Sequence, residues 1–241
     1  MAKNKIVQLQ TTSSELSEEP IENEIKLLKL SPQNKCSKNY YENKSLGLYV
    51  GIQASNNSVN ITTSHGSDEF VTIVEGTVSI KNNINGKAET ANKGESFVIP
   101  KGYDYQWQQS TDLITFQLTY QAPIESLSRS EKYENVFFID EKNETPWQNT
   151  SDGYKKKVEY QSQNKNFTAG VWQGGHFKTG LIAFPYNEFI LVKSGCLICT
   201  DTQESKIVVN IGEALFVPQG ANCSWESQGE ISLHFVQVKA D

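Results

Sequence analysis

Short apolar runs separated by polar turns recur along most of the chain. Residues 70–74, 77–80 and 113–118 are runs of this kind, and they are rich in β-branched side chains. Strand-length runs at such spacing are typical of an all-β sandwich or barrel, and no long helical period interrupts them. Residues 1–24 are polar and lack the pattern, so we expect a flexible arm there, with a short edge strand at 6–9.

The two halves of the chain carry the same Glu, Gly, Pro and Trp positions. The matched pairs lie 118 or 119 residues apart: Glu69 and Glu188, Gly76 and Gly195, Gly94 and Gly212, Pro100 and Pro218, and Trp107 and Trp225. Internal repeats of this length are duplicated domains rather than units of a solenoid. The repeat predicts β domains at residues 25–122 and 134–241, joined by a linker at 123–133, and we expect the apolar residues 136–139 to open the second domain.

The spacing within each half resembles the two motifs of the cupin superfamily. The first motif ends in Glu, six residues and Gly, and the second reads Gly, five residues and Pro-x-Gly. The Trp that follows each Pro by seven residues, and the segment 170–172 ahead of Tyr186, look like the ureidoglycine aminohydrolase and ethanolamine-utilisation branch of that superfamily. The resemblance covers residues 25–122 and 134–241. It implies two tandem jelly-roll β-barrels in one chain, a bicupin, but no single activity, because one jelly roll hosts unrelated chemistries.

Metal-binding cupins supply two His, a Glu and a further His, and most of these residue types are missing here. The corresponding positions hold Thr63, His65, Glu69 and Tyr105 in the first repeat and Ile182, Phe184, Glu188 and Cys223 in the second. A catalytic zinc site normally has three protein ligands. We therefore predict no cofactor; a divalent metal held by His65 and Glu69 is the alternative.

Two groups of side chains are candidate pockets, one in each predicted barrel. The first group is Thr63, His65, Glu69, Tyr105 and Trp107, and the second is Trp172, Tyr186, Glu188, Cys223, Trp225 and His234. Aromatic walls with a few converging polar groups are typical of a small-molecule pocket. The plainer interpretations are a hydrogen-bonded polar network in the first group and buried core side chains in the second.

We expect the first barrel to be the more open one. Ile182 and Phe184 should make the mouth of the second barrel narrow and dry, whereas the polar groups of the first barrel need partners such as water or a ligand. On this expectation, His65→Ala weakens the binding of a ligand, and Glu188→Gln in the other barrel does not.

The cysteines and a lysine run favour ordinary structural roles. Cys196 and Cys199 form a Cys-x-x-Cys pattern on a predicted strand rather than at a helix N-terminus, so a redox pair is not expected. Cys223 occupies a ligand position, which leaves a thiol at the pocket as an alternative. Residues 155–157 are three consecutive lysines, interpreted as a solvated run.

Composition and charge narrow the choice of partners. Of 241 residues, 22 are Lys or Arg and 28 are Asp or Glu, and the net charge of −6 argues against nucleic acid. The sequence shows no secretory signal pattern and no stretch apolar enough for a membrane helix, so we expect a cytoplasmic protein with no membrane partner. Exposed sheet edges, together with the family resemblance, favour a homodimer.

Two functions from different classes follow from these patterns. The first is the binding of a small polar metabolite in a barrel pocket without turnover. The second is an enzyme of hydrolase or isomerase type that acts on a small nitrogenous or carboxylate metabolite, as the resemblance to ureidoglycine aminohydrolase implies. The small number of metal ligands favours the first function, and no side chain is assigned a catalytic role.

Overall fold

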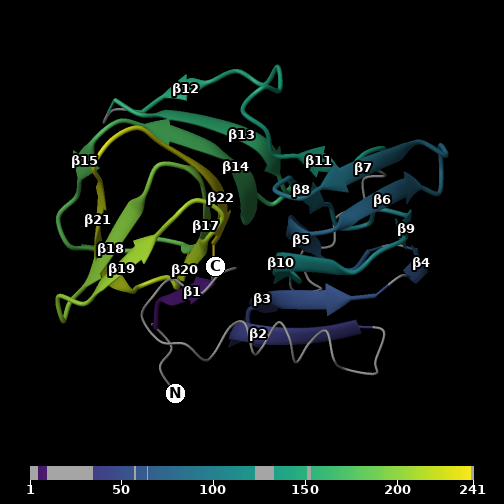
Figure 1. The fold of residues 1–241 in the computed structure, drawn as a ribbon, viewed down its shortest axis with the longest axis horizontal. Helices are drawn as coiled ribbons and strands as arrows, with labels where there is room; N and C mark the ends of the chain where they lie inside the picture. Colours follow the sequence, from purple (N-terminus) through teal and green to yellow (C-terminus); the bar gives the residue numbers. More distant parts are fainter. Residues whose placement is uncertain are drawn as a thin grey trace. The chain divides into compact units, whose positions relative to one another are not determined.

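The chain folds entirely as strands and turns wherever its structure is described (Figure 1). The computed structural model describes residues 5–9, 35–56, 58–63, 65–122, 133–150 and 153–239. Within these ranges there is no helix with the length and apolarity needed to span a membrane. Most of the predicted N-terminal arm, and linker residues 123–132, lie outside the described residues.

Two compact units make up the chain, and each contains two antiparallel sheets. The first unit, which we call the first barrel, is Thr11–Phe138; the second barrel is Ile139–Asp241 together with Met1–Gln10. The strands and sheets of both units confirm the predicted all-β class.

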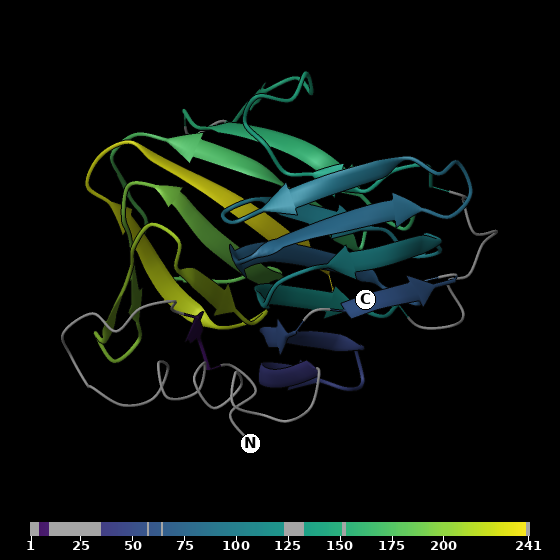
Figure 2. The same ribbon diagram turned by 45° about the vertical axis from the view of Figure 1, so that its right-hand side comes forward.

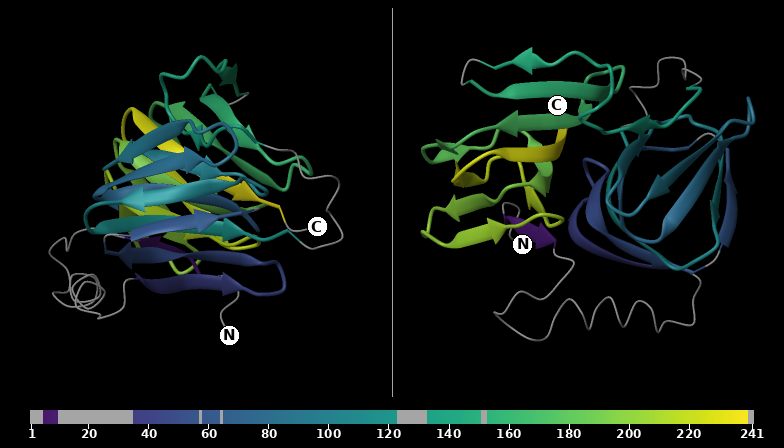
Figure 3. Two further views of the ribbon diagram at one scale, coloured as in Figure 1. Left: turned by 90° about the vertical axis from the view of Figure 1, so that its right-hand side faces the viewer. Right: turned by 45° about the horizontal axis from the view of Figure 1, so that its top comes forward.

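The first barrel pairs a six-stranded sheet with a four-stranded one. Its strands are β2 (Lys35–Asn43), β3 (Leu48–Ser55), β4 (Ser58–Thr62), β5 (Asp68–Glu75), β6 (Thr77–Asn82), β7 (Ala88–Asn92), β8 (Ser96–Ile99), β9 (Tyr105–Gln109), β10 (Leu113–Tyr120) and β11 (Phe137–Phe138). The sheet orders are β11-β8-β5-β10-β3-β2 and β4-β9-β6-β7. The hairpin of β6 and β7 faces the viewer in Figure 2, and the right-hand view of Figure 3 shows the blue and teal strands curving into a barrel.

The second barrel repeats this plan with a seven-stranded and a five-stranded sheet. Its strands are β1 (Val7–Leu9), β12 (Gln148–Asn149), β13 (Lys155–Gln161), β14 (Phe167–Gly174), β15 (Phe177–Lys178), β16 (Ile182–Ala183), β17 (Asn187–Ser194), β18 (Leu197–Asp201), β19 (Lys206–Val209), β20 (Ala214–Val217), β21 (Asn222–Ser227) and β22 (Ile231–Val238). The orders are β1-β20-β17-β22-β14-β13-β12 and β15-β21-β18-β19, with β16 paired to β21.

Matching glycines allow the same close backbone contact in both barrels. A Cβ on Gly51 would lie 2.2 Å from the carbonyl oxygen of Lys38, and one on Gly170 would lie 1.9 Å from that of Lys157. No side chain fits at such distances, so both positions require glycine. Each contact lies beside a β-bulge, in the β2–β3 pair and the β13–β14 pair respectively. The bulge bends the edge of the large sheet at the equivalent place in each barrel.

One short strand lies elsewhere than the sequence pattern predicts, and another forms where it was expected. β11, which we expected to open the second domain, pairs with β8 of the first barrel, and Val136 is buried in that barrel's core with Tyr133 and Phe138 packed nearby. The apolar segment is covered there by apolar neighbours. The expected edge strand near residues 6–9 does form: β1 pairs with β20 at the edge of the second barrel's large sheet, and Gln8 Nε2 donates to the carbonyl oxygen of Val208 at 2.7 Å.

One lysine of the 155–157 run is a buried anchor rather than a solvated side chain. Lys157 is 0% exposed, and its Nζ donates to the carbonyl oxygens of Glu141 and Asn143, both at 3.0 Å. The same Nζ forms an ion pair with Glu159 at 3.0 Å. The ammonium therefore ties the segment ahead of β12 to the outer face of β13.

Replacing Lys157 by Met should destabilise the second barrel by about 3–5 kcal/mol, because Glu159 would remain buried without its counter-ion. Urea unfolding followed by circular dichroism measures this loss. Lys155→Met, an exposed position on the same strand, is the matched control and should change stability by less than about 0.5 kcal/mol. Equal stabilities of the two variants would contradict the anchoring role.

Candidate functional site

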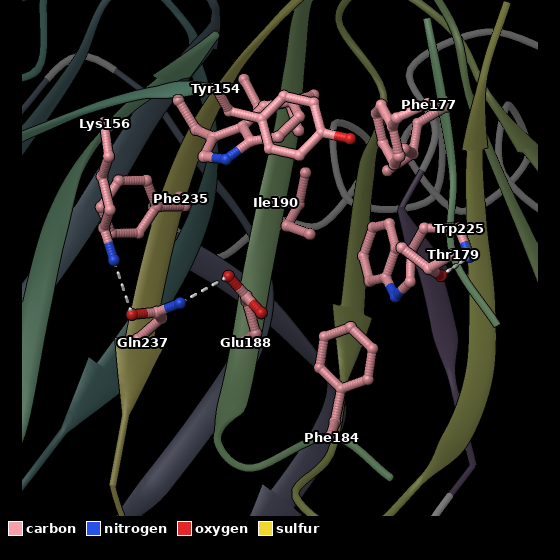
Figure 4. A pocket seen from close by; sticks show the side chains of 13 residues that line it. Tyr154, Lys156, Phe177, Thr179, Phe184, Glu188, Ile190, Trp225, Phe235 and Gln237 are labelled. Carbon is pink, nitrogen blue, oxygen red and sulfur yellow. Dashed lines mark hydrogen bonds between the residues drawn. The ribbon is translucent and has the colours of Figure 1, made fainter. Parts of the chain in front are cut away.

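A cavity of about 230 Å³ lies between the two sheets of the second barrel (Figure 4). Strands β13, β14, β17 and β22 contribute side chains from one sheet, and β15, β18 and β21 contribute them from the other. The lining residues are Tyr154, Lys156, Trp172, Phe177, Thr179, Phe184, Glu188, Ile190, Leu197, Trp225, Leu233, Phe235 and Gln237. The cavity is thus built mostly from aromatic and aliphatic side chains, with a small polar group at one end.

Two groups of aromatic rings form its walls. Tyr154 lies 4.7 Å from Trp172 and 5.4 Å from Phe177, measured between ring centroids. On another side, Phe184 and Trp225 lie 5.0 Å apart. Rings at these distances hold one another in place. The walls are therefore rigid faces against which a flat or apolar group can pack.

A carboxamide joins a carboxylate and an ammonium at the polar end. Gln237 Nε2 donates to Glu188 Oε1 at 2.9 Å, and Gln237 Oε1 accepts from Lys156 Nζ at 3.1 Å (Figure 4). Glu188 and Gln237 face each other because they are register partners on β17 and β22. Lys156 reaches them from β13, with its Nζ 4.3 Å from the centre of the Phe235 ring.

Burial pushes both charged groups toward their neutral forms. It raises the pKa of Glu188, and the hydrogen bond from Gln237 and the charge of Lys156 oppose the shift. Burial also lowers the pKa of Lys156, which Glu188 opposes. Titratable groups shifted in this way inside a cavity are typical of functional sites.

Three of the six side chains predicted for this pocket line it: Trp172, Glu188 and Trp225. His234 does not, because its neighbours Leu233 and Phe235 face the cavity and the two-residue period of β22 turns the imidazole to the opposite face. The interpretation of His234 as a pocket residue is therefore wrong.

The other two candidates also lie outside the cavity lining. Cys223 is 0% exposed in the core, where a hydrogen bond from the Cys199 thiol lowers the pKa of Cys223. Tyr186 lies beyond the lining, with the Nζ of Lys239 5.4 Å from its ring centre. The thiol alternative at the pocket thus receives no support from the position of Cys223.

The second barrel has two apolar residues at positions where metal-binding cupins have metal ligands, and these residues do not close it. Phe184 is one wall of the cavity, and Ile182 is 46% exposed. The expectation that these two side chains fill the mouth of the second barrel is therefore corrected. Sequence reasoning also missed Tyr154, Lys156 and Gln237, although the strand period offered a signal for Lys156: adjacent lysines on a strand cannot all face solvent on one side.

Three of the five candidates in the first barrel come together. His65 Nε2 lies 3.2 Å from Glu69 Oε2, and the His65 ring stands edge-on to Tyr105 at 5.7 Å. Burial and the charge of Glu69 raise the pKa of Tyr105. Thr63 is exposed, and Trp107, which packs against the core cluster that contains Tyr105, donates its Nε1–H to Gln109 Oε1 at 2.9 Å.

Few of the side chains that usually hold a metal ion come together in the described parts of the chain. Among the described residues, no group of three or more His, Cys, Asp or Glu side chains is placed to hold a metal ion. His65 and Glu69 supply two ligands, and the other two positions, held by Thr63 and Tyr105, add neither an imidazole nor a carboxylate.

Comparison with known proteins identifies the fold of the chain but does not assign the chain to a family. No family model matches the chain, and no curated protein matches it. A solved structure of a Pseudomonas syringae protein of unknown function from the DUF861 family has a TM-score of 0.71 at 15% identity, covering 88% of this chain and 96% of that one. A cupin 2 conserved barrel domain protein from Leptotrichia buccalis has a TM-score of 0.62 at 12% identity, covering 90% and 95%. The chain has the fold of a bicupin.

A salicylate 1,2-dioxygenase from Pseudaminobacter salicylatoxidans shares this fold, with a TM-score of 0.65 at 10% identity over 99% of this chain and 85% of that one. The likeness at such identities concerns the fold alone. None of these comparisons places the chain in the ureidoglycine aminohydrolase branch.

The buried imidazole of His234 should make the second barrel sensitive to acid. Burial, and after it the charge of Lys193, lowers the pKa of His234 from 6.5 to about 3. Between these values the unfolded chain binds a proton that the folded chain does not, so stability is lost as the pH falls through this window, by up to about 1.4 kcal/mol per pH unit.

His234→Gln should flatten the fall in unfolding free energy between pH 6.5 and pH 3, measured by urea unfolding at a series of pH values. His176→Gln changes an exposed histidine and serves as the control. Parallel pH profiles for the His234 variant and the unchanged protein would show that the imidazole is not buried in its neutral form.

Proposed function

We propose that the protein binds a small organic metabolite in the cavity of the second barrel. The observation that carries this proposal is the combination of rigid aromatic walls with one polar end, where Glu188 offers a carboxylate to the cavity. A mostly apolar cavity with a few converging polar groups is the usual form of a small-molecule site. The apolar body of the ligand would pack on the rings, and its polar head would meet Glu188 and Lys156.

The first barrel lacks the same polar arrangement at its equivalent positions. Where the second barrel has Lys156, Trp172 and Gln237, the first has Ser37, Gln53 and Thr119. The strand registers match at these places: Ser37 is paired with Gln53 as Lys156 is with Trp172, and Thr119 is paired with Glu69 as Gln237 is with Glu188. The ammonium and the carboxamide are thus specific to the second barrel, which supports placing the ligand there.

Tryptophan fluorescence can localise binding, because two of the four tryptophans line the cavity. Titration with panels of small amines, amides and carboxylates should change the emission of the protein. Trp172→Phe and Trp225→Phe should each remove part of that change, whereas Trp107→Phe and Trp147→Phe should leave it intact. Glu188→Gln should weaken binding roughly tenfold, the effect of losing a charge-assisted hydrogen bond.

The opposite pattern would move the site. A fluorescence change lost in Trp107→Phe, together with weaker binding in His65→Ala, would place the ligand in the first barrel and overturn the proposal. Binding that is retained in all the variants of the second barrel would also overturn the proposal.

A second candidate is an enzyme of hydrolase or isomerase type, and one observation favours it. Glu188 and Lys156 have pKa values shifted toward neutrality inside the cavity, which suits a carboxyl group that takes up and returns a proton. Nuclear magnetic resonance of bound metabolites over hours distinguishes the two functions. Turnover that disappears in Glu188→Gln, while binding persists, would support the enzyme.

The homodimer and the cytoplasmic location stay predictions. β4 is an edge strand among the described residues of its sheet, and it exposes Val59 and Ile61 at 55% and 71%. An apolar edge of this kind is a surface on which a second chain can pair.

A further inference from the structure

We infer that the ligand of the second barrel is a zwitterion of the amino-acid class, with its ammonium on Glu188, its carboxylate on Lys156 and an apolar or aromatic side chain along the ring walls. The inference rests on the proposed function and names the class of molecule that the site would take.

Two opposite charges face the same cavity without neutralising each other directly. Both Glu188 and Lys156 line the cavity, and the carboxamide of Gln237 stands between them (Figure 4). No ion pair joins the two side chains among the contacts of the described residues. The cavity therefore offers one negative and one positive group to the polar part of a ligand, and the carboxamide of Gln237 separates the two.

The hydrogen-bonding capacity left over fits the same pair of groups. Gln237 uses its oxygen on Lys156 and its nitrogen on Glu188, so the amide is committed to the protein. An ammonium has three donors, and Lys156 uses one of them on Gln237. Glu188 receives its hydrogen bond at Oε1 only, so Oε2 remains available as an acceptor. At the polar end, the open positions are an acceptor at Glu188 and donors at Lys156.

Charge balance separates a zwitterion from singly charged ligands. A simple amine at Glu188 would bring a second positive charge toward Lys156, and a simple carboxylate at Lys156 would bring a second negative charge toward Glu188. A zwitterion gives each protein charge an opposite partner at once. Its opposite charges would also oppose the effect of burial, which now raises the pKa of Glu188 and lowers the pKa of Lys156.

The apolar part of the cavity fits the side chain of such a ligand. Tyr154, Trp172 and Phe177 form one cluster of rings, and Phe184 and Trp225 form another. These rings offer no charge to a side chain, so a hydrophobic or aromatic one is favoured over a charged one.

The test compares each of three amino acids with its decarboxylated and deaminated analogues by isothermal calorimetry. The probes are L-phenylalanine, phenethylamine and 3-phenylpropionate, the corresponding indole series from L-tryptophan, and the corresponding aliphatic series from L-leucine. At least one amino acid should bind roughly tenfold or more tightly than both of its analogues, since each analogue lacks one charge-assisted contact.

Two variants assign the two charges. Lys156→Met should abolish the preference for the amino acid over the amine, and Glu188→Gln should abolish its preference over the carboxylate. Lys155→Met and Glu226→Gln are the matched controls, because Lys155 is exposed and Glu226 pairs with Lys178 outside the cavity. Both controls should keep both preferences. If the two charges only stabilised the structure, each substitution would weaken the binding of all three probes by the same factor.

Two results would overturn the inference. If an amine or a carboxylate binds as tightly as its parent amino acid in every series, the ligand is not a zwitterion, although the cavity remains a binding site. If no amino acid binds while the fluorescence titration finds another small molecule in the cavity, the inference fails and the proposed function stands. Absence of any ligand in both experiments would remove the proposed function as well.

Discussion

In a closed barrel, every second side chain of a strand faces the interior, and this alternation decides the role of each residue here. Three consecutive lysines on β13 show its effect. Lys156 faces the cavity, whereas Lys155 and Lys157 face outward, and only Lys157 is covered by the segment that its ammonium holds. The same alternation sends the side chain of Gln237 into the cavity and that of His234 to the opposite face of β22. Strand register decides which side chains reach the site, and residue type then decides the chemistry they bring.

An interior of this kind accepts charge only when each charged group has partners. Burying a carboxylate or an ammonium alone costs several kcal/mol, roughly, and the pKa shifts of Glu188 and Lys156 express that cost. Gln237 reduces it by donating to one group and accepting from the other. The arrangement leaves Glu188 Oε2 and two of the Lys156 donors without a hydrogen-bond partner among the described residues. Incomplete partnering of groups that face an aromatic cavity distinguishes this site from the His65–Glu69 contact of the first barrel, in which the two side chains meet directly at 3.2 Å.

The fold could be predicted from sequence because the residues that end its strands and form its turns lie close together in the sequence. Glycines and prolines at fixed spacing mark the ends of strands, and their recurrence after 118 or 119 residues indicated two similar domains. The positions of Trp172, Glu188 and Trp225 at the cavity followed from the same spacing. Lys156 could not be found in this way, because it comes from a strand outside the motifs and its partners are set by the register of three strands. The prediction for His234 failed for a related reason. A residue on a barrel strand can face either side of the sheet, and its type does not reveal which side it faces.

The cores of the two barrels differ in the size of two side chains that follow the second motif. In the first barrel, Tyr103 and Tyr105 stack at 5.7 Å in the buried core. At an offset of 118 residues, the second barrel has Ala221 and Cys223. The backbone is the same at this point, since the amide of Tyr103 donates to Pro100 and that of Ala221 donates to Pro218. Two phenol rings of the first barrel thus correspond to a methyl group and a thiol in the second, and both small side chains are buried in its core. Neither Ala221 nor Cys223 lines the cavity, and both pack in the core cluster that contains Phe184 and Trp225 of its wall. The aromatic and charged residues of the lining determine what the cavity can hold.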